Sequence, residues 1–295
     1  MKVISIFGGT GFIGTELINQ LVKISFKINV FTRKKNKADH LRSLPGVTIL
    51  EFSSKNFLSA KLKDSDIIIN LVGILHESKR EKFSTAHEDF VSKLIKYAQK
   101  NNINRLIHLS ALGVNRISES RYLHSKYKTE LIIRNNFKAH NWTILRPSIV
   151  FGRNDKFINL FKIIVRFLPV IFLIAPKSEF QPIHVDDLVN IIIKTIVNKK
   201  TYKKTYNLGG PKKLTLYEIV NLITKCDKKT NVIISLNKTM SYILVRLLML
   251  SPIKVITTDN LKSMEISNTV MRNDAYSFMR SLKELSTYLT NYKKN

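Results

Sequence analysis

Residues 3–14 read VISIFGGTGFIG, an apolar, β-branched run followed by a turn with three evenly spaced glycines. The run is typical of a buried strand, and the residues after it have helical spacing. Gly8 permits a tight turn, Gly11 lets the backbone approach a pyrophosphate, and Gly14 lets the helix pack close to the strand. The helix N-terminus then offers N–H groups to phosphates. The stretch therefore predicts a dinucleotide-binding turn made by Gly8, Gly9, Thr10, Gly11, Phe12, Ile13 and Gly14.

Further strand-like runs follow through the first half of the chain. They are KINVFTR, GVTILEF, DIIINLVG, NRLIHLSALG and WTILRPSIVFG. Helix-length segments separate them, and strands that alternate with helices indicate βαβ units with a parallel sheet. We therefore predict an α/β fold, a Rossmann-like doubly wound parallel sheet with a smaller C-terminal lobe.

The alternation weakens after about residue 151, and this suggests how the chain is divided. Residues 1–151 are expected to form an NAD(P)-binding Rossmann domain whose core continues into later segments. Residues 152–270 are expected to form a substrate or partner lobe interleaved with it. Residues 271–295 form a polar tail that we expect to be loosely attached. Within the lobe, Thr215 and Glu218 predict a capping box at a helix start.

The end of the second strand indicates which nucleotide is bound. An NAD-binding fold usually ends this strand with an acidic residue that holds the ribose 2′-OH. Here the strand runs into NVFTRKKNK, residues 29–37. An acid would repel a 2′-phosphate, whereas Arg33 attracts one and Lys34 adds a further contact. We therefore predict NADPH as the cofactor in preference to NADH.

Other nucleotide contacts are expected at the ends of later strands. NLVG, residues 70–73, ends the fourth strand, and Gly73 lets the backbone lie close to the cofactor ribose. After the third strand, many proteins of this fold carry an aspartate for the adenine, and Ser53 or Ser54 are the candidates here. The expected contacts from the later strands are Asn70, Leu71, Val72, Gly73 and Pro147.

The charge of the chain is unusual, with a formal net charge of +28 over 295 residues. We favour a lysine-biased composition on exposed positions, and an anionic membrane surface or an acidic partner stays open. Specific nucleic-acid binding is disfavoured because the lysine blocks do not alternate with aromatic residues. A single cysteine, Cys226, excludes an internal disulfide and fits a reducing, cytoplasmic compartment.

Two apolar segments suggest a location near a membrane. Residues 157–176 are roughly long enough to span a bilayer, but Lys162, Arg166 and Pro169 interrupt them. We expect a packed helix and loop, or contact with a membrane interface, and not a spanning helix. Residues 239–252 are too short to span. Glycines break the apolar run at the N-terminus, so no signal peptide is expected. We expect a peripheral position at the inner face of the cytoplasmic membrane.

The stretch SRYLHSK places Tyr122 four residues before Lys126, on one face of a helix. A lysine cation favours the phenolate of a nearby tyrosine, so such a pair can move a proton during hydride transfer. Lys126 can equally hold the nicotinamide ribose without any chemistry. From the residues alone, both proton transfer and cofactor holding stay open as interpretations of this pair.

Histidines and aspartates give weaker signals. His184, Asp186 and Asp187 in HVDD could suggest a metal, but the aspartates fit the first turn of a helix, so we predict no metal site. His87 and His124 are expected to be packed or solvated.

Taken together, GGTGFIG, NLVG, HLSALG, ILRPSIVFGRND and the Tyr122–Lys126 pair resemble the extended or atypical short-chain dehydrogenase/reductases. The chain is more similar to one branch, the NADPH-binding accessory subunit of respiratory complex I and its bacterial homologues. That resemblance depends on SRYLHSK, FGRNDKFIN, QPIHVDD and SPIKVITTDN, and it covers roughly residues 1–270.

The resemblance implies tight NADPH binding and a Rossmann domain with a smaller lobe. In active members a serine holds the substrate oxygen, which implies Ser110, Tyr122 and Lys126 as the catalytic set. Ser110 and Lys126 are also implied as cofactor contacts. The complex I branch implies a largely structural cofactor, with respiratory complex subunits as partners. Three functions stay open: an accessory or assembly component that holds NADPH, an active NADPH-dependent reductase or dehydrogenase on a small, quinone-like or lipid substrate, and a redox-sensing regulator that reads the NADPH level.

Overall fold

The computed structural model describes residues 2–24, 26–52, 62–78, 81–138, 140–251 and 256–292. The chain forms two compact units, each assembled from separate stretches of sequence. Unit 1 comprises Met1–Ser110, Ser125–Arg146 and Val189–Tyr206. Unit 2 comprises Ala111–His124, Pro147–Leu188 and Asn207–Asn295. Each unit therefore combines segments that lie far apart in the sequence.

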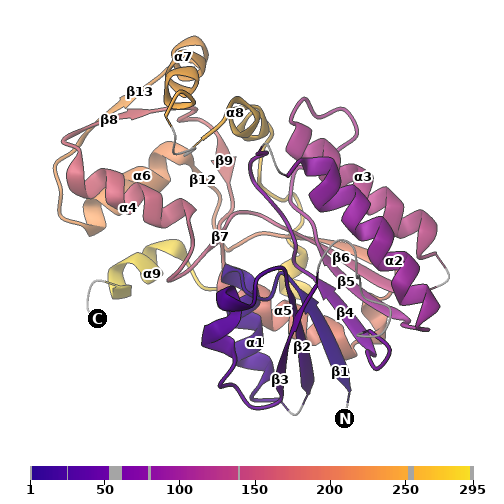
Figure 1. The fold of residues 1–295 in the computed structure, drawn as a ribbon. Helices are drawn as coiled ribbons and strands as arrows, with labels where there is room; N and C mark the ends of the chain where they lie inside the picture. Colours follow the sequence, from indigo (N-terminus) through magenta and orange to yellow (C-terminus); the bar gives the residue numbers. More distant parts are fainter. Residues whose placement is uncertain are drawn as a thin grey trace. The chain divides into compact units, whose positions relative to one another are not determined.

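Unit 1 is built on a central sheet with the strand order β11-β6-β5-β4-β1-β2-β3 (Figure 1). In this order, each strand from β6 to β3 is parallel to its neighbour. The strands are β1 (Val3–Phe7), β2 (Lys27–Thr32), β3 (Val47–Glu51), β4 (Ile67–Asn70), β5 (Arg105–Leu109), β6 (Asn141–Pro147) and β11 (Lys204–Leu208). Since the chain enters the sheet at β1 and winds outward in both directions, β1 and β4 lie at its centre.

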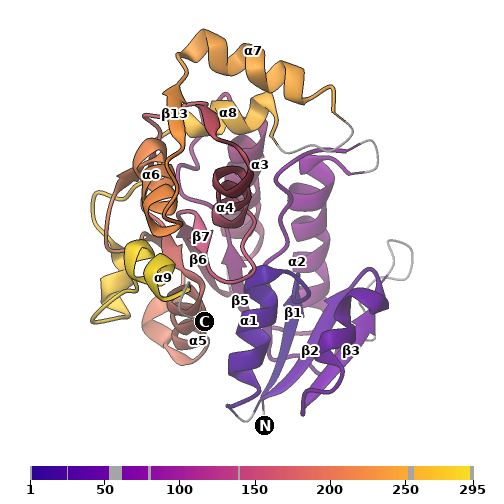
Figure 2. The same ribbon diagram turned by 90° about the vertical axis from the view of Figure 1, so that its left-hand side faces the viewer.

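Helices flank both faces of this sheet (Figure 2). They are α1 (Phe12–Leu21), α2 (Phe90–Lys100), α3 (Arg121–Asn136) and α5 (Val185–Val197), with shorter helical turns η1 (Lys35–Leu41), η2 (Ser84–Asp89) and η3 (Lys199–Thr201). Strands covered on both faces read as continuous apolar runs, and β4 and β5 are buried at every position. The predicted doubly wound, Rossmann-like α/β fold is confirmed.

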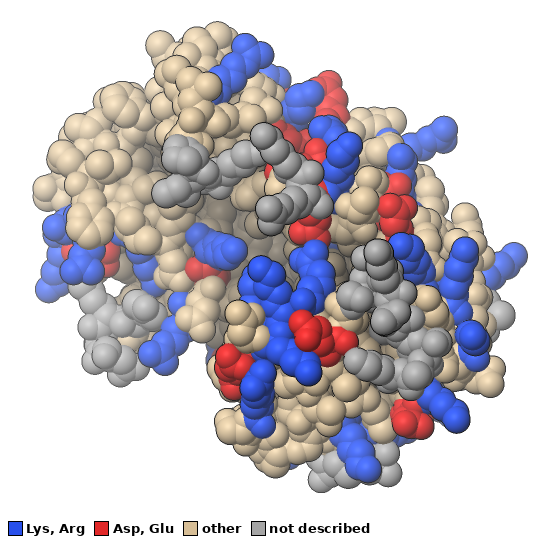
Figure 3. Space-filling view, in the orientation of Figure 1, with Lys and Arg blue, Asp and Glu red and all other residues tan. Residues whose placement is uncertain are grey.

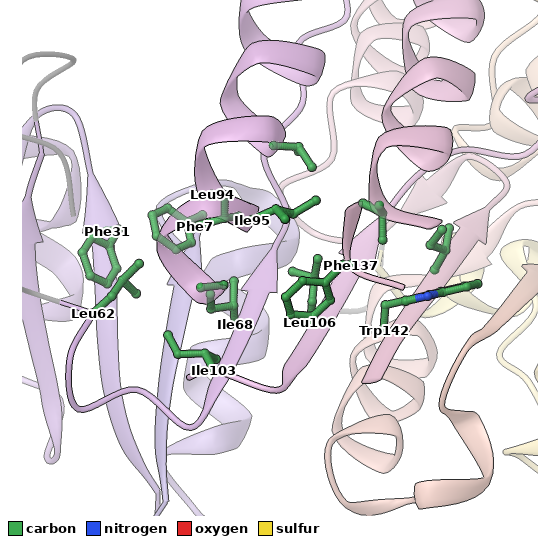
Figure 4. Packing of buried hydrophobic residues seen from close by; sticks show 14 residues of the cluster. Phe7, Phe31, Leu62, Ile68, Leu94, Ile95, Ile103, Leu106, Phe137 and Trp142 are labelled. Carbon is green, nitrogen blue, oxygen red and sulfur yellow. The ribbon is translucent and has the colours of Figure 1, made fainter. Parts of the chain in front are cut away.

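The core of unit 1 holds the carboxyl ends of its central strands in place. Phe7 at the end of β1 stacks on Phe31 of β2, with ring centroids 4.6 Å apart. Leu94 and Ile95 of α2 and Phe137, which directly follows α3, belong to the same buried cluster (Figure 4). Phe7 directly precedes the glycine turn, and Phe31 lies two residues before Arg33. Packing therefore fixes the places where the predicted nucleotide contacts begin.

Unit 2 contains short strand pairs and helices around a second core. Its elements are β7 (Val150–Phe151), α4 (Phe157–Phe167), β8 (Val170–Leu173), β9 (Glu179–Phe180), β10 (Ile183–His184), β12 (Leu214–Thr215), α6 (Leu216–Cys226), β13 (Val232–Ser235), α7 (Lys238–Leu248), α8 (Thr258–Met264), η4 (Asp274–Ser277) and α9 (Leu285–Tyr292). Helix α6 begins with the expected capping box of Thr215 and Glu218, so that prediction is confirmed.

The apolar segments and the tail form regular structure in unit 2. Residues 157–176 become α4 and β8, and residues 239–252 contribute α7. Among the described residues, no helix is long and apolar enough to cross a membrane. The tail, which we expected to be loosely attached, buries Leu285 and Leu289 of α9 in the core of the unit. Lys283 also donates its backbone N–H to Asp187 at 2.7 Å.

Candidate functional site

The glycine turn after β1 leaves no room for a side chain at Gly8 or Gly14. Gly8 has a φ of +80°, and a β-carbon there would lie 2.9 Å from the carbonyl carbon of Leu71. A β-carbon on Gly14 would lie 2.4 Å from the Gly8 carbonyl oxygen. Only glycine fits at both places, because the atoms it meets belong to the backbone. The predicted roles of Gly8 in the turn and of Gly14 in close packing agree with this geometry.

The N-terminus of α1 is built to receive an anion. Gly11 is the N-cap, and among the described residues no side chain caps this end of the helix. The first turn also contains no acidic residue. The N–H groups of the first turn therefore point out of the helix with a partial positive charge, which favours a phosphate.

The carboxyl end of β4 is shaped by its own side chains. Asn70 accepts a hydrogen bond from the backbone N–H of Val72 at 3.0 Å, and its amide lies 3.1 Å from Nδ1 of buried His108. Burial lowers the pKa of His108 well below its usual value, and the neighbouring Lys126 cation lowers it further. Asn70 thus fixes the turn that carries Leu71 and Val72 past Gly8.

Lys126 lies beside this turn and is buried. Its Nζ donates to the carbonyl oxygen of Leu109 at 3.2 Å, and a β-carbon on Gly73 would lie 3.3 Å from the same Nζ. Burial lowers the pKa of Lys126 to about 8, although Glu130 opposes that shift. The ammonium group therefore lies at the carboxyl end of the sheet, next to the backbone of Gly73.

His87 holds the backbone next to Gly73. Its Nε2 accepts from the backbone N–H of Ile74 at 3.2 Å, so Nδ1 carries the proton and donates to Ser125 Oγ at 2.8 Å. Burial, followed by the Lys126 cation, lowers the pKa of His87 to about 3. The expectation that this histidine is packed agrees with its burial, and its position shows that it shapes the site.

Ser110 is engaged with a buried carboxylate. Its hydroxyl donates to Glu130 at 2.6 Å. Glu130, whose side chain is only 1% exposed, also accepts from Arg146 through two nitrogens, at 2.7 and 2.5 Å, and from Arg134 at 3.0 Å. The Ser110 hydroxyl hydrogen, which the predicted role would direct to a substrate oxygen, therefore belongs to this network.

Tyr122 lies in the first turn of helix α3, in a stretch that belongs to unit 2, and an aspartate distant in sequence caps that helix. Asp259 of α8 accepts from the backbone N–H groups of Arg121 at 2.6 Å and Tyr122 at 3.1 Å, and from the Ser120 hydroxyl at 3.1 Å. Asp259 lies in the late motif SPIKVITTDN, so two of the motifs that carry the family resemblance meet here. Tyr122 is half-buried, and desolvation of its phenol raises its pKa to about 12. That direction opposes the lowering we expected from Lys126.

The end of β2 carries Arg33 as predicted, together with a partner that the sequence did not reveal. Arg33 Nη1 lies 2.5 Å from Oε1 of Glu81, which belongs to the loop after β4. Thr32 donates its hydroxyl to the carbonyl of Lys34 at 3.0 Å, which shapes the turn after the strand. Arg33 and Lys34 are both exposed and accessible to a ligand.

The remaining predicted residues have structural contacts or lie elsewhere. Pro147 ends β6 and accepts from the backbone N–H of Leu112 at 2.9 Å within unit 2. Asp186 pairs with Lys283, and among the described residues no group of three His, Cys, Asp or Glu side chains could hold a metal ion. Ser53 and Ser54, the candidates for an adenine contact, lie outside the described residues.

The residues missed by sequence reasoning are Glu81, Glu130 and Asp259. Only Glu130 had a local signal, because Lys126, Glu130 and Arg134 recur every four residues along the helical stretch. Three charged residues at this spacing on an otherwise buried face would have indicated a paired network. Glu81 and Asp259 act on residues far away in the sequence.

A glycine turn at a helix start, with the buried Lys126 of α3 bonded to the end of β5, is the geometry expected of a protein that binds a dinucleotide. A family described as NAD(P)H-binding matches residues 8–157. The chain belongs to this NAD(P)H-binding family.

The relatives of this chain include subunits of a respiratory complex. It is 30% identical over 232 residues to NADH dehydrogenase (ubiquinone) 1 alpha subcomplex subunit 9 of Arabidopsis thaliana, covering 75% of this chain and 57% of that protein. It is 27% identical to the mouse protein of the same name over 277 residues, covering 91% and 73%. The predicted resemblance to the complex I subunit is confirmed as homology. The chain spans little more than half of the Arabidopsis relative.

Solved structures with the same fold include sugar-nucleotide enzymes. UDP-glucuronic acid 4-epimerase from Bacillus cereus, in complex with UDP-glucuronic acid and NAD, superposes with a TM-score of 0.75 at 19% identity over 99% of both chains. A nucleoside-diphosphate-sugar epimerase from Staphylococcus aureus gives a TM-score of 0.77 at 15% identity, covering 98% of this chain and all of that one. At such identities the likeness shows the fold alone.

Proposed function

We propose that this protein holds NADPH as an accessory or assembly component of a membrane respiratory complex, without turning the nucleotide over. The observation that carries this proposal is the hydrogen bond from Ser110 to Glu130 at 2.6 Å, because it removes the donor that a substrate oxygen would need. The raised pKa of Tyr122, about 12, also disfavours proton transfer near neutral pH. Lys126, Gly73 and the glycine turn remain suited to binding.

A second function is favoured by one feature of the site. Lys126 follows Tyr122 by one helical turn, which is the arrangement that an active reductase or dehydrogenase of this class would use. Such an enzyme would transfer hydride between NADPH and a small, quinone-like or lipid substrate. Tyr122 would then exchange a proton with the substrate oxygen.

Substitutions on helix α3 separate these functions. We expect Tyr122→Phe to leave the dissociation constant for NADPH within about twofold, because it removes a hydroxyl that binding does not need. Lys126→Met should weaken NADPH binding about 10- to 100-fold, because it removes a charged hydrogen-bond donor. Fluorescence titration measures both. The matched control is Lys128→Met, a change to an exposed lysine on the same helix.

The reductase function would be supported by one result in particular. If wild-type protein oxidises NADPH with a quinone or lipid carbonyl substrate and Tyr122→Phe abolishes this turnover while binding is unchanged, the holding function is wrong. Equal NADPH binding by wild-type protein and Lys126→Met would contradict both functions, since each requires Lys126 at the nucleotide.

The preference for NADPH is proposed from Arg33. An exposed guanidinium at the end of β2 can pair with a 2′-phosphate, which NADH lacks. We expect Arg33→Ala to weaken NADPH binding about 10- to 100-fold and to change NADH binding less than about twofold. Calorimetric titration with each nucleotide measures the preference. Arg42→Ala, which removes another exposed arginine paired with Asp39, should leave the ratio unchanged.

The proposed site of docking is an apolar face of unit 2. Val170 and Phe172 of β8 pair in register with Val232 and Ile234 of β13, and all four are substantially exposed. Phe167 at the end of α4 is 71% exposed. In Figure 3, the part of the surface over these elements is mostly free of charged side chains. An exposed apolar patch of this kind supports contact with another protein of the assembly.

Native isolation tests the proposed assembly and the peripheral position at the inner face of the cytoplasmic membrane. We expect the protein to fractionate with membranes, to co-purify with respiratory complex subunits, and to carry NADPH. Phe172→Ser combined with Ile234→Ser should release it from the complex while NADPH binding is retained. Binding to lipid vesicles without any subunit would instead favour the membrane surface as the partner.

A further inference from the structure

Glu81 lies next to Arg33, the residue proposed to bind a 2′-phosphate. The two side chains are 2.5 Å apart, and they are 64% (Arg33) and 27% (Glu81) exposed. The backbone N–H of Glu81 donates to Ser78 Oγ at 3.1 Å, and its carbonyl accepts from the Ser78 N–H at 2.9 Å. Hydrogen bonds with Ser78 therefore hold the backbone N–H and carbonyl of Glu81 in place.

This carboxylate does not come from strand β2 itself. An NAD-binding chain ends β2 with its own acidic residue, which accepts the ribose 2′-OH. Here β2 ends in Thr32 followed by Arg33, and the acid comes from a residue 48 positions further along the chain. One site thus combines a cation suited to a 2′-phosphate with an anion suited to a 2′-hydroxyl.

We propose that Glu81 sets how strongly this protein prefers NADPH over NADH. Its carboxylate accepts the 2′-hydroxyl of NADH and repels the 2′-phosphate that Arg33 attracts. The inference rests on the proposed role of Arg33 in binding that phosphate. An exposed ion pair contributes little stability, so an incoming phosphate can engage the guanidinium without a large cost in breaking the pair. The negative charge of Glu81 stays nearby in the complex and weakens NADPH binding.

Glu81→Gln keeps the size of the side chain and removes its charge. We expect this variant to bind NADPH about three- to tenfold more tightly, because two negative charges a few ångströms apart no longer repel each other. NADH should bind about two- to fivefold more weakly, since an amide is a poorer acceptor than a carboxylate. Titration calorimetry with both nucleotides gives the ratio of dissociation constants. The gain for NADPH should shrink as salt is raised, because the pair is exposed and screened.

Glu88→Gln is the matched control. It removes the same charge from a nearby part of unit 1, where Glu88 faces Lys128 at 3.9 Å and not Arg33. The ratio of the NADPH and NADH dissociation constants should be the same for Glu88→Gln and wild-type protein. If Glu88→Gln and Glu81→Gln gained affinity for NADPH equally, the effect would come from net charge alone and the proposal would be overturned.

Arg33→Ala measured in parallel distinguishes the two ways of failing. If Arg33→Ala lowers the preference for NADPH but Glu81→Gln leaves the ratio within about twofold of wild type, the role of Glu81 is wrong and that of Arg33 stands. If Arg33→Ala changes nothing, the NADPH preference proposed from Arg33 fails, and the role of Glu81 fails with it.

Discussion

Gly14→Ala should destabilise the protein by about 1–3 kcal/mol or more and remove most of its NADPH binding. The new β-carbon would lie 2.4 Å from the Gly8 oxygen and 2.6 Å from the Gly9 α-carbon. Because these are backbone atoms of the turn, relief requires α1 to move away from β1. The helix N-terminus then no longer faces the nucleotide phosphates. Urea unfolding measures the loss of stability, and nucleotide titration measures the loss of binding.

Gly11→Ala is the control for this prediction, because its effects on stability and binding should separate. The N-cap has a φ of −87°, which alanine adopts, and among the described residues the β-carbon would come within 4 Å only of the Gly8 oxygen, at 3.3 Å. We expect a stability change of less than about 1 kcal/mol. NADPH binding should still weaken about 5- to 150-fold, because the methyl group would lie where the pyrophosphate approaches. Wild-type stability of Gly14→Ala would show that α1 and β1 are not packed as described.

The sheet was predictable because its signals are local. VISIFGGTGFIG contains a strand, a turn and a helix start within twelve residues, and each depends on neighbours in sequence. Strand β11 shows the limit of such patterns. Its sequence KTYNL is short and half-buried, and nothing in it indicates that it pairs with β6 at the edge of the sheet. The sheet partner is chosen by tertiary packing, which a single sequence does not display.

The candidate site was likewise predictable only where its signals are local in the sequence. The spacing of Tyr122 and Lys126 placed both on one helix, and the structure contains that helix as α3. Their chemistry depends on groups that arrive from elsewhere. Burial, which no spacing reveals, raises the pKa of Tyr122 to about 12. Asp259 reaches the start of the same helix from a position 137 residues further on than Tyr122. The sequence therefore identifies the residues, while their protonation and contacts require the fold.

Glu130→Ala should cost about 3–5 kcal/mol of unfolding free energy, the largest effect we expect from a single side chain outside the glycine turn. Glu130 is buried and accepts from Ser110, Arg134 and Arg146. Removing its carboxylate leaves Arg146, whose side chain is only 20% exposed, without its bidentate partner. An uncompensated charge away from water is far more costly than the loss of an exposed ion pair. Guanidinium unfolding measures the change in free energy.

Asp39→Ala provides the comparison for Glu130→Ala, because it also removes a carboxylate paired with an arginine. Its side chain is 59% exposed, so its loss should change stability by less than about 1 kcal/mol. Ser110→Ala should cost about 1 kcal/mol, since Glu130 keeps both arginines when that hydroxyl is gone. If Glu130→Ala and Asp39→Ala lowered the unfolding free energy equally, water would have to reach Glu130. Ser110 would then be free to turn toward a substrate, and the case for NADPH holding without turnover would weaken.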